Sequence, residues 1–163
     1  MRRSIEAHLG TRQVARVIYG AIIGMALVVV LQAHPPEAGS VAISLASTAV
    51  AVAVAEIYSE ILGTETRTRR HVSREQVREI GVDATAVAFG VAFPAVFFVL
   101  AAVGVMETKT AFRLATWSGV GLIGFYGFAA GRLAGEGVAT SLLQGLGAVL
   151  IGVAIIVVKA LVH

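Results

Sequence analysis

Hydrophobic residues in this chain fall into five long stretches, separated by short links that contain charged residues, glycine or proline. Each stretch has about 20 to 25 residues, enough for a helix rising about 1.5 Å per residue to cross the hydrocarbon core of a bilayer. The pattern therefore predicts an all-α, polytopic integral membrane protein with five transmembrane helices in a single transmembrane domain. The predicted spans are residues 14–33, 41–62, 82–106, 111–133 and 138–162.

Composition agrees with a membrane protein. Hydrophobic residues make up 57% of the 163 residues and charged residues only 14%, which leaves too little polar surface to cover a water-soluble globule. The lipid bilayer is the expected partner, and nucleic acid is not, although the formal net charge is +3. The chain has no cysteine, which excludes disulfides and thiolate chemistry. No hydrolase, zinc-protease or phosphate-loop motif is found, so we expect neither an enzyme nor a resident cofactor.

The positions of the basic residues predict how the helices are oriented. Arginine and lysine favour the cytoplasmic side of a membrane, and a cytoplasmic amino terminus places ten of the thirteen there. We therefore predict a multi-pass cell-membrane protein with its amino terminus in the cytoplasm. Residues 64–81 form a basic cytoplasmic link that we expect to attract anionic lipid head groups. Within it, Ser73 and Gln76 have the spacing of a capping box, which predicts a helix starting at Arg74, either a short one within the link or one that runs on into the third span.

Small residues and one proline predict how the spans pack. Gly20 and Gly24 form a GxxxG motif in the first span, and Gly127 and Gly131 have the same spacing in the fourth. Such glycines allow the backbones of two membrane helices to approach closely, although they also permit hinge motion in transporters. Pro94 removes a backbone donor in the middle of the third span, which predicts a kink there.

Three acidic residues inside the predicted spans are the candidates for chemistry. A charged side chain in hydrocarbon costs at least about 2.5 kcal/mol on insertion scales, so each is a functional candidate. Glu56 and Glu60 are four residues apart and share one helix face near the cytoplasmic end of the second span, and Asp83 opens the third span at a similar depth. The three carboxylates together predict a site for a hard divalent metal cation. Because carboxylates held close together also bind protons more readily, the site would suit exchange of the cation for protons.

The same acids also have a purely structural interpretation. They lie within about two turns of the inner interface, where acidic side chains reach toward water or pair with nearby cations. The arginines in reach by this argument are Arg16, Arg67 and Arg132.

Three short segments resemble the vacuolar iron transporter family. Residues 17–25 (VIYGAIIGM) are similar to the opening of the family's first helix, residues 55–59 (AEIYS) to its Gly-Glu-Tyr-Leu-Ser pattern, and residues 127–135 to its Gly-Arg-containing link. The resemblance implies a five-span homodimer that exchanges ferrous iron or another divalent cation for protons. Glu56 matches a family ligand, but Ile23 stands where the family has an intramembrane Asp.

Two functional hypotheses follow. The first is a proton-coupled divalent metal cation transporter, or a degenerate relative of one, in which the metal ion is the substrate. The second is a non-transporting membrane scaffold or accessory subunit, whose acids neutralise the arginines of the inner surface and which needs no charge at Ile23. A small channel ranks below both because the spans lack a polar stripe.

Overall fold

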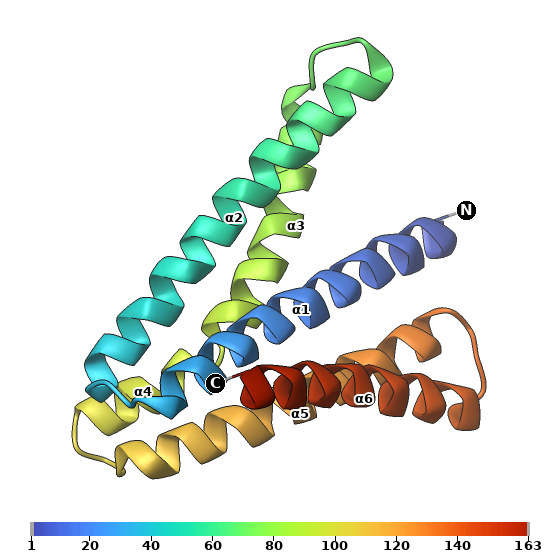
Figure 1. Ribbon diagram of the computed structural model, residues 1–163. Coiled ribbons are helices and arrows are strands. Elements are labelled where there is room, and N and C mark those ends of the chain that lie inside the picture. Colours follow the sequence, from blue (N-terminus) through green and yellow to red (C-terminus); the bar gives the residue numbers. More distant parts are fainter. Residues whose placement is uncertain (1, 163) are drawn as a thin grey trace.

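The computed structural model describes the backbone of residues 2–162 and the side chains of residues 13–154, 157 and 158. Throughout residues 2–162 all regular secondary structure is helical, as predicted. In chain order the helices are α1 (Arg2–Ala33), α2 (Ala38–Thr68), α3 (Arg74–Ala92), α4 (Ala95–Ala102), α5 (Thr108–Leu133) and α6 (Val138–Val162) (Figure 1).

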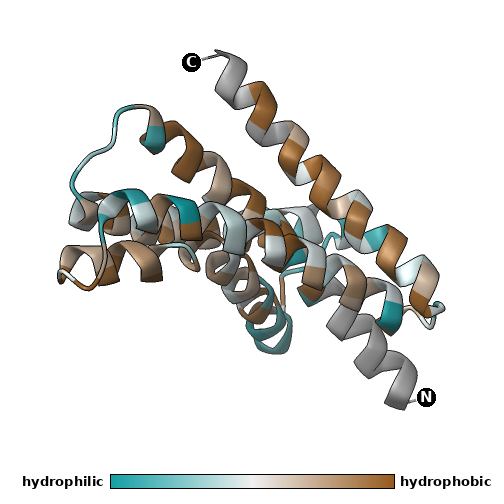
Figure 2. Cartoon of the chain, turned by 90° about the horizontal axis from the view of Figure 1, so that it is seen from below, coloured by the Kyte–Doolittle hydropathy of each residue, from teal (hydrophilic) through white to brown (hydrophobic). Residues whose placement is uncertain are grey.

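The helices have the length and composition of membrane spans. Three helices are each long and apolar enough to cross a membrane: α1 over Gln13–Ala33, α2 and α5. The consecutive helices α3 and α4 qualify together as one bent pair, and the described part of α6 adds an apolar segment, Val138–Ala154. Figure 2 shows hydrophilic colour mainly near helix ends and turns, whereas the helix that leads to the carboxyl terminus is largely hydrophobic. The fold is thus that of an all-helical bundle with apolar helices suited to a membrane.

The turns between the helices lie at two ends of the molecule. The α1–α2 and α4–α5 turns lie at one end, on the left of Figure 1, and the α2–α3 and α5–α6 turns lie toward the other. The start of α1 lies at this second end, which also carries the arginines of the α2–α3 turn.

Helix α1 is the central element of the bundle. It packs along α3 on one side and α5 on the other, with a smaller contact to α6 and little to α2. Gly20 and Gly24 of α1 face α3 closely: a Cβ at Gly20 would overlap the Val87 carbonyl, and one at Gly24 would lie 2.7 Å from the Val91 oxygen. The GxxxG motif therefore serves close helix packing, one of its two predicted uses.

A second glycine contact joins α5 to α6. A Cβ at Gly127 would lie 2.9 Å from the Cβ of Ala148, and one at Gly131 would lie 2.8 Å from Ser141. From the other side, a Cβ on Gly145 would lie 2.8 Å from the Gly124 oxygen. These glycines too mark a packing face, as their spacing predicts.

The predicted kink at Pro94 separates α3 from α4. The two helix axes are bent by 49°, and Pro94 itself is buried. The bend positions Phe98 of α4 edge-on to Phe112 of α5, with ring centroids 4.8 Å apart. Both phenylalanines belong to the hydrophobic core at this end of the bundle, which also contains Val41 and Leu45 of α2.

Candidate ionic site around Arg16

The three acids predicted from the sequence converge on one side chain, Arg16 of α1. Helices α1 and α3 run parallel, and Gly20 and Gly24 of α1 approach Val87 and Val91 of α3. One helical turn before the first of these contacts, between Gly20 and Val87, stand Arg16 on α1 and Asp83 on α3. The glycine packing therefore fixes the register that brings Arg16 beside Asp83.

Arg16 contacts a carboxylate through each of its three guanidinium nitrogens. Its Nη1 forms an ion pair with Oε1 of Glu56, its Nε lies 3.2 Å from Oδ2 of Asp83, and its Nη2 lies 3.8 Å from Oε2 of Glu60. The side chains of Arg16 and Asp83 are only 16% and 14% exposed. Because α1 otherwise has little contact with α2, the ion pairs with Glu56 and Glu60 are an important link between these two helices.

The cluster, defined as Arg16 with Glu56, Glu60 and Asp83, is a cation-binding arrangement in chemical terms. Carboxylate oxygens from two helices surround one positive group, and such oxygens are also the ligands of hard divalent cations. The guanidinium stays charged at any physiological pH and offers a fixed fork of N–H donors, which suits several carboxylates at once. A metal ion at this position would have to displace the guanidinium from at least part of the cluster.

Of the three arginines that the sequence offered as partners, Arg16 is the one seen at the acids. Arg132, at the end of α5, instead donates from Nη1 to the backbone oxygen of Glu136 at 2.7 Å. The signal for Arg16 was present in the sequence, since it precedes Gly20 by one helical turn on the same face.

The α2–α3 turn contains a second, smaller polar network. Oε1 of Glu65 accepts the backbone N–H of Val72 at 3.1 Å and lies 3.0 Å from Nδ1 of His71. Glu65 lies beyond the predicted span, and the hydrogen bond with His71, followed by that from Val72, lowers the pKa of its carboxyl. Ser73 and Gln76 form the predicted capping box, and α3 starts at Arg74.

Comparisons with known proteins add no assignment: no protein-family model, curated protein or solved structure matches this chain. Within the part of the chain that the structure describes, no group of three or more histidine and acidic side chains has an arrangement that could hold a metal ion. The acids of the cluster are the ion-pair partners of Arg16 in this structure.

Proposed function

We propose that the chain is a five-span membrane protein with a cytoplasmic amino terminus. The five apolar helical segments support this topology, as does the arginine-rich turn at the same end as the start of α1. The absence of cysteine makes a direct test simple. A membrane-impermeant maleimide should label Lys109→Cys in intact cells, and Arg70→Cys only after permeabilisation. The reverse pattern would overturn the orientation.

We further propose that the protein is a proton-coupled carrier of a divalent metal cation and works as a homodimer. The observation that carries the proposal is the convergence of Glu56, Glu60 and Asp83, from two helices, on one cationic centre. Ionisable groups inside membrane segments are costly and mark ion or proton pathways by default. Arg16 then acts as an internal cation that the substrate replaces, and its release loosens α1 from α2, which has little other contact with it.

The resemblance to the vacuolar iron transporters points in the same direction, but only through Glu56. Ile23 has no carboxylate, so the first helix would contribute no acidic ligand at that position. In this proposal the ligands come from α2 and α3 instead, and α1 contributes the competing charge.

A second candidate function is supported by the same cluster. If Arg16 never leaves the acids, the ion pairs are a permanent connection between α1 and the α2–α3 hairpin, and the protein is a scaffold or accessory subunit. The partial burial of Arg16 favours this alternative, and so does Ile23, whose apolar side chain can neither bind a cation nor carry a proton. The two candidates differ in what removal of the guanidinium does to metal binding.

Titration calorimetry with manganese(II) and zinc(II) separates the two candidates. The carrier proposal predicts that Glu56→Gln weakens binding and that Arg16→Gln strengthens it, because the internal competitor is gone. Glu75→Gln, an exposed acid on the first turn of α3, is the matched control and should bind as the unaltered protein does. Absence of binding by every folded variant, Arg16→Gln included, would favour the scaffold.

A further inference from the structure

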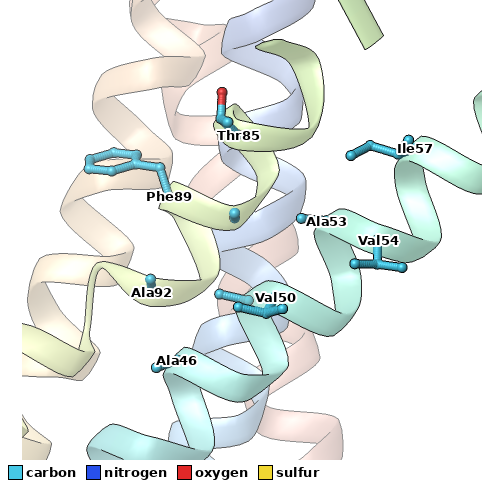
Figure 3. A pocket seen from close by; sticks show the side chains of 10 residues that line it. Ala46, Val50, Ala53, Val54, Ile57, Thr85, Phe89 and Ala92 are labelled. Carbon is cyan, nitrogen blue, oxygen red and sulfur yellow. The ribbon is translucent and has the colours of Figure 1, made fainter. Parts of the chain in front are cut away.

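An apolar groove runs between α2 and α3 on the outside of the hairpin. Its volume is about 450 Å³, and half of the residues that line it are alanines, including Ala46 and Ala53 of α2 and Ala88 of α3. Figure 3 shows the lining side chains on the two helices, with Phe89 on α3 and Val54 on α2. The small alanine side chains leave a hollow between helices that are otherwise in contact.

The groove offers no free side-chain hydrogen-bond donor to a ligand, and its one side-chain acceptor is the hydroxyl oxygen of Thr85. Thr85 is the one polar residue among the ten that line it, and its Oγ1 already donates to the Val82 carbonyl at 2.7 Å. A polar ligand would lose its hydration in the groove without replacement, which is unfavourable. A hydrocarbon chain has no polar groups whose hydration is lost, and it gains dispersion contacts with the side chains that line the groove. The chemistry of the groove therefore selects an apolar chain.

One end of the groove points toward a concentration of positive charge. The lining ends at Ile57 on α2 and Thr85 on α3, and both helices continue from there to the α2–α3 turn. Ten residues separate Ile57 from Arg67, about 15 Å along the helix. Residues 64–81 contain five arginines and three glutamates, and the carboxylate of Glu65 is engaged within the turn. The exposed arginines are Arg67, Arg69, Arg70, Arg74 and Arg78.

We propose that this groove binds one acyl chain of an anionic phospholipid, whose phosphate is held by arginines of the α2–α3 turn. The two halves of the site match the two halves of the lipid: an apolar, alanine-lined groove for the chain, and guanidinium groups for the phosphate. The site goes beyond a general attraction of the basic turn to membranes, because it requires one lipid in one place. It is independent of metal transport.

Native mass spectrometry of the purified protein tests the site, with phosphatidylglycerol and phosphatidylcholine of identical chain length. An arginine near the surface contributes about 1 kcal/mol to anionic lipid binding, so two contacts correspond to roughly a 30-fold preference for phosphatidylglycerol. Arg70→Gln with Arg74→Gln should abolish most of this preference. Arg113→Gln, an exposed arginine on α5, should leave it unchanged.

The groove is tested with large side chains on one helix. Ala53→Phe should fill the groove and reduce retention of both lipids by about tenfold or more, the effect of losing buried hydrocarbon contacts. Ala51→Phe is the matched control, because Ala51 is an exposed alanine of α2 outside the groove. Ala46→Phe, at an exposed position within the groove, repeats the test should Ala53→Phe fail to fold.

Three results would overturn the proposal. The first is equal retention of the two lipids by the unaltered protein. The second is equal retention by the Ala53→Phe, Ala46→Phe and Ala51→Phe variants. The third is a shift from dimer to monomer in Ala53→Phe without any change in lipid retention, which would show that a second copy of the chain occupies the groove.

Discussion

Replacement of Arg16 by glutamine is predicted to destabilise the bundle more than replacement of any exposed arginine. The guanidinium contacts Glu56, Glu60 and Asp83, and its removal takes the ion-pair partner from Glu56. Exposed pairs contribute about 0 to 1 kcal/mol, and breaking a fully buried pair costs about 3 to 5 kcal/mol. With 16% of its side chain exposed, Arg16 lies nearer the buried limit, and we expect a loss of about 2 to 3 kcal/mol.

Unfolding in sodium dodecyl sulfate, followed by circular dichroism, measures this loss. The matched control is Arg113→Gln, which removes an exposed arginine of α5 and should change stability by less than about 0.5 kcal/mol. Arg16→Lys keeps the charge but not the planar fork, so its loss should be intermediate. Equal stability of Arg16→Gln and Arg113→Gln would contradict this prediction, since the cluster would then contribute nothing to the fold.

Three further predictions concern helix packing and the α2–α3 turn. A Cβ at Gly20 would overlap the backbone of α3, whereas one at Gly121 meets nothing within 4 Å. In the same unfolding assay, Gly20→Ala should therefore lower the free energy of unfolding by about 1 to 3 kcal/mol. Gly121→Ala should be neutral or slightly stabilising. Equal effects would contradict the close approach. Ser73→Ala removes the cap of α3 and should cost about 1 kcal/mol, seen as faster amide exchange in the first turn; unchanged exchange would show the cap to be inert. NMR titration should give Glu65 a pKa below its ordinary value of 4.5, raised again by His71→Ala. Because the pKa of Glu65 is lowered in the folded state, the stabilisation from its hydrogen bonds is present at pH values above the ordinary pKa. It is lost as the pH falls through the folded-state pKa. An unshifted pKa of Glu65 would contradict this prediction.

Local features of the fold could be predicted from the sequence because each depends on a few neighbouring residues. The capping box at Ser73 requires only Gln76 three residues later, and the bend at Pro94 requires only a missing N–H in a helix. The glycine motif at Gly20 and Gly24 predicted a packing face, but not which helix would occupy it. That choice depends on the arrangement of all the helices, which places α1 between α3 and α5.

Only the acids of the candidate site could be predicted from the sequence. Its acids could be identified because charge is rare in apolar segments, and Glu56 and Glu60 share a face by their spacing alone. The role of Arg16 as their common partner depends on the parallel register of α1 and α3, which is a tertiary property. The α2–α3 groove likewise arises from alanines on two helices, such as Ala53 and Ala88, whose facing positions the sequence does not determine.

Metal uptake into proteoliposomes tests the proposed function most directly. Iron(II), manganese(II) and zinc(II) should be supplied with and without a pH gradient to the unaltered protein, to Glu56→Gln and to the control Glu75→Gln. The carrier proposal predicts gradient-dependent uptake of at least one metal by the unaltered protein and the control, and its loss in Glu56→Gln. Uptake no greater than in protein-free liposomes, from correctly folded protein, would contradict the proposal and leave the scaffold as the better account.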